Sequence, residues 1–274
     1  MCELLGVSIV PAARLGVYFK EFRPRAEGNE EGWGIAWWED GHPHVVKEPI
    51  RADESELAAT LAHDPPISDV FIVHVRAATI GHASVENTHP FTAAALGREW
   101  GFAHNGTVNE LDRLVTGAYE QTGDTDSELA FHHLLTRLER LGHAASDDEI
   151  AAEVLATGRE LSEYDSRVNF LLSDGRTLFA YHDGHRTLHV VQKHAADLGE
   201  IPMADADYNL SLRLGDAPDE RAVIVASVPL TDEPGWEKLD AGEFLVIRDG
   251  AITERATLRT SVQAATARTA PSPR

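Results

Sequence analysis

The sequence predicts an α+β fold built mainly from antiparallel sheets. Two observations indicate it: β-prone segments follow one another in hairpin-like runs, and the two clearest helical segments are adjacent in the chain. In addition, the sequence contains no G-x-G-x-x-G motif and no phosphate-binding loop. We therefore expect neither a series of βαβ units nor a nucleotide cofactor, and no other cofactor is predicted.

Strands are expected wherever short runs of β-branched and aromatic residues are bounded by turn residues. Asp-Gly pairs, which favour hairpin turns, occur at 40–41, 174–175, 183–184 and 249–250 and are expected to separate such runs. The predicted strands are 4–10, two within 32–46, 69–77, 167–173, 176–182, 187–193, 221–227 and two within 243–254.

Three segments have helical character. Residues 125–141 are the clearest, because leucines recur on one side and Thr125 with Glu128 matches a capping box. Those leucines are Leu129, Leu134, Leu135 and Leu138. A second helix is expected over about 147–164, and a shorter one over 52–64 from the spacing of Leu57 and Leu61.

Length and charge limit the domain organisation and the partners. We expect one domain over residues 2–256 and a polar, Pro- and Ser-rich tail over 257–274 that is partly flexible. Acidic residues outnumber basic ones 45 to 24, a formal charge of −21, which argues against binding to nucleic acid or to an anionic membrane. No apolar run is long enough to span a membrane and no secretory leader opens the chain, so a cytoplasmic protein is expected.

Cys2 is the only cysteine among 274 residues. It cannot form an internal disulfide or by itself a structural zinc site, and most such thiols are buried and inert. Its position favours another interpretation. If Met1 is removed, Cys2 gains an α-amine with a pKa of about 7.7–8.0, able to act as the base for its own thiol.

Several stretches add groups that carry chemistry: HVRAATIG at 74–81, FAHNGTV at 102–108 and DTDSE at 124–128. Alone, Asn105-Gly106 is typical of a hairpin turn and Asp126 of a helix N-terminus. Together with MCELLGVS, GWGIAWW and ENTHPF, however, these stretches resemble the class II glutamine amidotransferases in wording and order, and are most similar to the stand-alone bacterial members. The resemblance implies the N-terminal nucleophile hydrolase fold, a four-layer αββα sandwich of two antiparallel sheets.

The resemblance also implies roles for six residues. The nucleophile is expected at Cys2, donors to the oxyanion at Asn105 and Gly106, a grip on the substrate α-carboxylate at Arg76 and Thr79, and a partner for its α-ammonium at Asp126. The residue types suit these tasks. An arginine binds a carboxylate bidentately, and an amide N–H beside a backbone N–H can stabilise a tetrahedral oxyanion.

Some positions depart from the family pattern or favour other interpretations. Ala77 and Ile80 stand where some members have Trp and His, which leaves the γ-glutamyl substrate open, and His82 is expected at the pocket rim. Gly32, Trp33 and Gly34 are expected to pack closely against Cys2. A metal site among His74, His82, His89 and His104 is disfavoured, because no H-x-x-x-H spacing with a nearby acid occurs on a predicted helix.

These inferences predict an enzyme that cleaves a γ-glutamyl amide through a γ-glutamyl thioester on Cys2 and releases ammonia or an amine. Three alternatives stay open: a glutaminase that supplies ammonia to a separate synthase subunit, an independent hydrolase of a γ-glutamyl conjugate similar to ergothioneine-pathway amidohydrolases, and a non-catalytic glutamine-binding protein. The expected partner is glutamine or another γ-glutamyl small molecule. The sequence leaves a homo-oligomer open.

Overall fold

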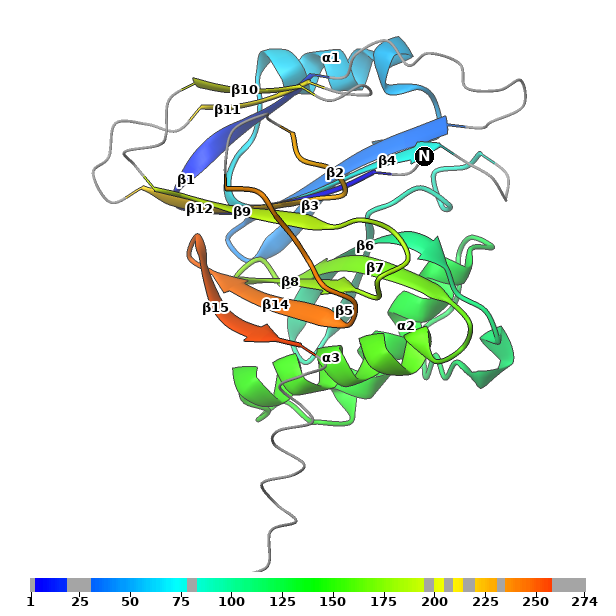
Figure 1. The fold of residues 1–274 in the computed structure, drawn as a ribbon. Helices are drawn as coiled ribbons and strands as arrows, with labels where there is room; N and C mark the ends of the chain where they lie inside the picture. Colours follow the sequence, from blue (N-terminus) through cyan, green and yellow to red (C-terminus); the bar gives the residue numbers. More distant parts are fainter. Residues whose placement is uncertain are drawn as a thin grey trace, which may run out of the picture.

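Two antiparallel sheets stack face to face with helices on their outer sides, which confirms the predicted α+β class and the αββα sandwich (Figure 1). The computed structural model describes residues 3–18, 31–77, 83–194, 200–204, 209–213, 220–230 and 235–257. No helix among these residues is long and apolar enough to cross a membrane.

The larger sheet begins with the N-terminal strand and contains nine strands within the described ranges. Its main path runs β13-β9-β12-β1-β4-β2-β3, and β11 pairs with both β1 and β10. The bounds are β1 Glu3–Tyr18, β2 Glu31–Glu39, β3 His42–Glu48, β4 Ile67–Ala77, β9 His189–His194, β10 Glu200–Ala204, β11 Asn209–Arg213, β12 Arg221–Ala226 and β13 Glu237–Lys238.

The smaller sheet has the order β15-β14-β8-β7-β6-β5. Its strands are β5 Phe91–Ala95, β6 Arg98–Thr107, β7 Arg167–Ser173, β8 Thr177–His182, β14 Glu243–Arg248 and β15 Ala251–Ala256. The helices α2 (Asp126–Glu139) and α3 (Asp147–Ser162) cover its outer face, and α1 (Glu56–His63) packs on β1 of the larger sheet (Figure 1). Short 3₁₀ turns occur at Ala52–Glu54 and Leu111–Arg113.

Two of the four Asp-Gly pairs have the backbone of a two-residue hairpin. Both residues of Asp40-Gly41 and of Asp249-Gly250 have positive φ, and each pair joins two adjacent strands. This is the conformation of a two-residue hairpin of type I′. Asp183-Gly184 differs, because the chain crosses there from β8 in the smaller sheet to β9 in the larger one.

Alternation along β1 distributes its side chains between two cores. Leu4 belongs to the core between the sheets, whereas Leu5 and Val7 belong to the core on the outer face. Gly6 lets the sheets approach, because a Cβ atom there would lie 3.1 Å from the side chains of Leu171 and Leu178. The first strand is therefore buried on both faces, as its apolar sequence predicts.

The helical leucines follow the predicted pattern only in part. Leu134, Leu135 and Leu138 are fully buried, but Leu129 is half-buried. In α1, Leu61 packs against the core while Leu57 stays 47 % exposed. A short helix that packs on one strand buries only a narrow stripe of its surface. One of two leucines four residues apart can therefore lie at the edge of the buried stripe.

Candidate active site

The six predicted site residues are described by the structure to different extents. Asn105 and Gly106 lie near the end of β6, and Asp126 is the first residue of α2. Arg76 lies near the end of β4, where only its backbone is described. Cys2 and Thr79 lie outside the described residues, as does His82.

Asn105-Gly106 is part of a strand and not a hairpin turn. Asn105 pairs with Asn169 and Gly106 with Val168 on β7. Asn105 is buried, and its Nδ2 lies 3.5 Å from the Oγ of Ser227, which directly follows β12. Its side chain therefore points across the sandwich toward the larger sheet.

Gly106 occupies a position that excludes any side chain. A Cβ atom built there would lie 1.7 Å from the carbonyl oxygen of Arg167 and 2.8 Å from Nε2 of His104. Since the nearest obstacle is backbone in the paired strand, the sheet itself would have to move. Glycine is thus required at the residue predicted to present its backbone N–H to the oxyanion.

His104 has a structural role beside this glycine. Its Nε2 lies 3.0 Å from the carbonyl oxygen of Arg167, which can only accept, so Nε2 carries the hydrogen. Its Nδ1 then accepts from Ser127 Oγ at 2.9 Å. Burial lowers the pKa of His104, and the nearby charge of Asp126 opposes that shift. The His104 ring is therefore a packed, hydrogen-bonded side chain.

Ser227 joins the start of β1 to Asn105. The backbone N–H of Leu4 donates to Ser227 Oγ at 2.9 Å, and the N–H of Ser227 donates back to the carbonyl of Leu4 at 3.0 Å. The same Oγ is the atom near Asn105 Nδ2. The first described residues of β1 and the amide of Asn105 are thereby held at one end of the sandwich.

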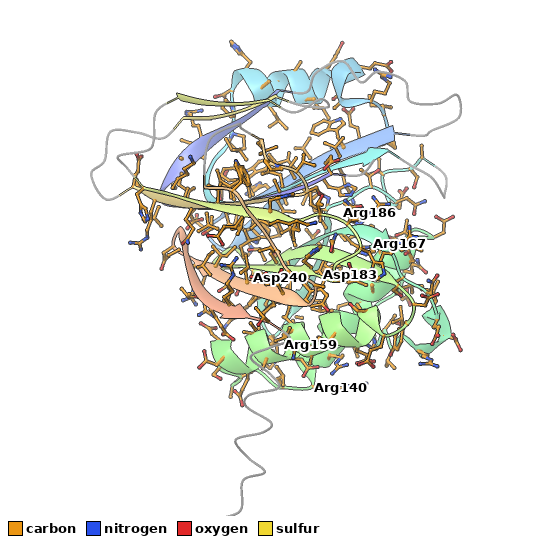
Figure 2. The ribbon with its side chains drawn as sticks, in the orientation of Figure 1. Arg140, Arg159, Arg167, Asp183, Arg186 and Asp240 are labelled. Atoms are coloured by element: carbon orange, nitrogen blue, oxygen red, sulfur yellow. The ribbon has the colours of Figure 1, made fainter. Side chains whose placement is uncertain are left out.

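A pocket of about 320 Å³ opens at this end. Its walls come from β1, β6, the segment that links β8 to β9 and the residues after β12: Glu3, Asn105, His185, Arg186, Thr187, Ser227 and Val228. Arg186 donates from Nη1 to Oδ1 of Asn105 at 2.7 Å. Figure 2 shows Arg186, Asp183 and Arg167 at the same end of the molecule as the start of β1 in Figure 1.

The ENTHPF motif packs on the glycine-rich strand β2. A Cβ atom on Gly34 would collide with the carbonyl of His89, and one on Gly32 would lie 3.3 Å from Thr88 Oγ1. Gly32 is also paired with Arg76 across β2 and β4. The glycines thus allow residues 88–89 to lie against the strand beside Arg76, while the predicted contact with Cys2 involves a residue outside the described ranges.

ENTHPF is in turn bound to the DTDSE motif. Asn87 Nδ2 donates to Asp124 Oδ1 at 2.6 Å, and Asp124 N donates to Asn87 Oδ1 at 2.9 Å. Lys47 Nζ donates to the carbonyl of Thr88 at 2.7 Å. Two motifs separated by more than thirty residues in sequence therefore form one unit beside the start of α2.

Only half of the predicted capping box at α2 forms. Thr125 accepts from the backbone N–H of Glu128 at 3.2 Å. The carboxylate of Glu128 does not return to the cap residue and instead accepts from the backbone N–H groups of Thr122 and Gly123 at 2.8 and 2.9 Å. The preceding loop thus competes successfully for this buried carboxylate.

Asp126 connects α2 to the end of the strand that carries Asn105. Its Oδ2 accepts from the backbone N–H of Val108 at 2.5 Å. A carboxylate has lone pairs on both oxygens, so this bond leaves capacity for a second donor. The residue predicted to bind the α-ammonium therefore also fixes the chain immediately after Gly106.

No group of three or more His, Cys, Asp or Glu side chains that could hold a metal ion occurs within the described part of the chain. His74 and His89 do lie close, with ring centroids 4.4 Å apart, and His89 also contacts Phe91. These rings pack in an aromatic cluster next to β2 and β4.

Comparison with known proteins decides the family. Residues 1–271 match the class-II glutamine amidotransferases. The chain belongs to this family. It is 36% identical over 252 residues to the protein MJ1515 of Methanocaldococcus jannaschii, covering 91% of this chain and 70% of that one. It is 32% identical over 249 residues to YafJ of Escherichia coli K12, provisionally assigned as a glutamine amidotransferase, covering 89% and 96%.

Solved structures agree with the family and the fold. The crystal structure of a predicted glutamine amidotransferase from Pseudomonas aeruginosa PA01 superposes with a TM-score of 0.78 at 27% identity, over 92% of this chain and all of that one. A more distant relative is the gamma-glutamyl-hercynylcysteine sulfoxide hydrolase of Mycolicibacterium smegmatis, 27% identical over 248 residues that cover 86% of this chain and 88% of that enzyme.

Three residues around Asn105 were not predicted from the sequence: Arg186, Ser227 and Asn169. Their contacts to Asn105 and its surroundings bridge 81 residues for Arg186 and 122 for Ser227. Asn169 could have been found by pairing the predicted strand 167–173 with the stretch around Asn105. Nothing local distinguishes the other two.

Proposed function

We propose that the protein hydrolyses a γ-glutamyl amide, with the thiol of Cys2 as nucleophile and Asn105 and Gly106 as donors to the oxyanion. The observation that carries the proposal is the link between the chain start and the oxyanion pair. Glu3, the residue joined to Cys2, is 5% exposed and lines the same pocket as Asn105. The chain start is thus tied through Ser227 to the amide predicted to stabilise negative charge.

The reaction has two acyl-transfer steps. After removal of Met1, the α-amine of Cys2 takes the thiol proton and sulfur attacks the γ-carbonyl carbon. The carbonyl π electrons move to oxygen, which the Asn105 amide and the Gly106 N–H stabilise. When the tetrahedral intermediate collapses, the C–N bond breaks and the leaving nitrogen takes the proton back. Water then attacks the thioester carbonyl and gives a proton to the α-amine. The C–S bond breaks, the α-ammonium returns that proton to sulfur, and the γ-carboxylic acid leaves and ionises in solution.

The unreacting end of the substrate has its own partners in this proposal. Arg76 with Thr79 holds the α-carboxylate, and Asp126 pairs with the α-ammonium. The role of Asp126 is supported by its position, because its carboxylate accepts from the N–H of Val108, which stands two residues after Gly106. The proposed role of Arg76 is supported by the position of its backbone, which pairs with Gly32 beside the ENTHPF segment.

Two leaving groups fit the proposal: ammonia delivered to a separate synthase, and an amine from a γ-glutamyl conjugate. The second is favoured by one observation. The Mycolicibacterium smegmatis relative, which is named as a hydrolase of a γ-glutamyl conjugate, is matched over 88% of its own length. The proposed reaction requires no metal or cofactor, since side chains and water supply every group in it.

The test is a panel of γ-glutamyl amides incubated with the protein, assayed separately for glutamate and for ammonia or amine. Turnover of at least one member is expected, with its loss in Cys2→Ala. Leu57→Ala, which changes an exposed side chain of α1 outside this pocket, should retain turnover as a control for general disturbance. Equal rates in Cys2→Ala and wild type would refute the mechanism, and absence of turnover with the whole panel would favour a non-catalytic binding protein.

A further inference from the structure

From the contact between Arg186 and Asn105 we infer that Arg186 is a positioning residue for catalysis: it fixes and polarises the Asn105 amide so that Nδ2–H is presented to the oxyanion. The inference rests on the proposed function, because it assigns Asn105 a donor role. It adds a residue from a distant part of the chain, on the segment that passes from the smaller sheet to the larger one.

The contact defines which end of the amide faces which way. Guanidinium nitrogens only donate, so Nη1 of Arg186 at 2.7 Å requires the oxygen of Asn105 at that point. The NH₂ group is thereby directed to the opposite side, toward Ser227 and the start of β1. Without a donor on Oδ1, a rotation of the amide by half a turn would present oxygen, which repels an oxyanion.

The charge of Arg186 strengthens the donor as well. A hydrogen bond from a cation to an amide oxygen is stronger than one between neutral groups, and it withdraws electron density from the amide nitrogen. The N–H bonds of Asn105 become more polar as a result. A lysine could place a charge here but not the planar fork of donors that defines the orientation of its partner.

The segment that carries Arg186 is anchored on both sides. Asn169 Nδ2 donates to the carbonyl of Arg186 at 3.2 Å, and Asn169 Oδ1 accepts from Asp183 N at 3.2 Å. Thr187 Oγ1 donates to the carbonyl of Ser227 at 2.8 Å. Asn169, which holds the Arg186 segment, pairs directly with Asn105 across β6 and β7. The residue that anchors Arg186 and the residue that Arg186 contacts therefore lie opposite each other on neighbouring strands.

The experiment measures kcat and KM for L-glutamine, or for the panel amide with the highest turnover, in Arg186→Ala, Arg186→Lys, Asn105→Ala and the double variant of Arg186→Ala with Asn105→Ala. Arg176→Gln, which removes an exposed arginine from a turn, serves as the matched control for lost charge. Arg186→Ala is also assayed with millimolar guanidinium, and with methylammonium as the comparison.

We expect Arg186→Ala to lower kcat by roughly tenfold to fiftyfold, less than the 10²–10³ typical of a lost oxyanion donor, with KM nearly unchanged. Guanidinium should restore part of kcat and methylammonium should not. In the Asn105→Ala background, removal of Arg186 should have no further effect. Arg186→Lys should lose activity too, and carries the test if the alanine variant does not fold.

Additive losses in the double variant would overturn the inference, as would unchanged kcat in the Arg186 variants or a loss confined to KM. Failure of the proposed function is distinguished by labelling. A diazoketone analogue of glutamine should label Cys2 in the wild type and in Arg186→Ala. If Cys2 is labelled, and if the wild type turns over substrate while Cys2→Ala does not, the proposed function stands. A normal rate in Arg186→Ala would then refute only the role of Arg186.

Discussion

The substitution Gly106→Ala tests how closely the fold and the chemistry are connected. The added Cβ atom would lie 1.7 Å from the carbonyl oxygen of Arg167, half of the 3.4 Å at which ordinary van der Waals contact begins. No rotamer relieves this clash, since both the new atom and its obstacle are fixed to backbone. The end of β6 must therefore separate from β7, or the backbone must twist away.

The cost follows from the bonds at this point. Separation weakens the ladder between Gly106 and Val168 and the hydrogen bond from His104 Nε2 to the Arg167 carbonyl. At about 1 kcal/mol for each hydrogen bond, with further loss from groups left buried, the free energy of unfolding should fall by about 2–4 kcal/mol. For a chain of this size that corresponds to a decrease in Tm of roughly 5–15 °C.

Activity should fall further than stability explains. Asn105, the proposed oxyanion donor, precedes the displaced residue, and a misplacement of about 1 Å in a catalytic group can reduce the rate about 100-fold. The measurements are Tm by calorimetry and kcat at a temperature where both proteins are folded. Gly101→Ala is the matched control on the same strand: its Cβ atom would meet the indole of Trp38 at 2.8 Å, far along β6 from Asn105.

Gly101→Ala should therefore lower Tm while kcat of the folded enzyme stays near the wild-type value. Gly106→Ala should lower both. If Gly106→Ala folds with wild-type Tm and wild-type kcat, the close approach of β6 and β7 does not govern the site, and the reasoning from this geometry is wrong.

Three other predictions concern the surroundings of the site. Burial lowers the pKa of Lys47 from 10.5 to about 8, although the negative charges of Glu128 and Glu86 act to raise it. Between about pH 8 and 10.5 the unfolded chain therefore binds more protons at Lys47 than the folded protein does. The free energy of unfolding should consequently rise by about 1–3 kcal/mol between about pH 8 and 10.5, and urea titrations of Lys47→Met should lack that rise. The same dependence of unfolding free energy on pH in Lys47→Met and wild type would contradict the prediction. Asn87→Ala breaks both bonds to Asp124 and should raise KM more than it changes kcat, because the unit beside Arg76 loosens; a pure kcat defect would argue otherwise. Asp126→Asn should raise KM for a γ-glutamyl amide, whereas Asn105→Ala should lower kcat by roughly 10²–10³; the reverse pattern would place the substrate backwards.

Local sequence signals predicted most of the fold. The hairpin turns predicted at Asp40-Gly41 and Asp249-Gly250 are confirmed. An Asp-Gly pair readily adopts the positive φ at two successive residues that such a turn requires. The helix at 126–139 follows from periodic leucines and a cap residue, and this helix and the one at 147–162 both begin within one residue of the expected positions. Such features depend on residues close together in the chain.

The contacts that organise the site could not be predicted in this way. The Arg186–Asn105 bond spans 81 residues and depends on the crossing between sheets, which the Asp183-Gly184 signal does not distinguish from a hairpin. Glu128 shows the opposite failure. Its spacing from Thr125 matches a capping box, but a neighbouring loop offers its carboxylate better donors. The sequence motifs predicted a site at Asn105 and Gly106 without indicating which contacts hold these residues in place.

The central claim is that Cys2 is the first residue of the active protein and carries the γ-glutamyl group. It is tested most directly by acid-quenching a reaction under saturating substrate and measuring the intact and peptide masses. The prediction is a chain without Met1 that bears one glutamyl group, located on the peptide containing Cys2 and released by hydroxylamine. A fully active enzyme that retains Met1, or one that turns over with no glutamyl group on Cys2 at any quench time, would contradict it.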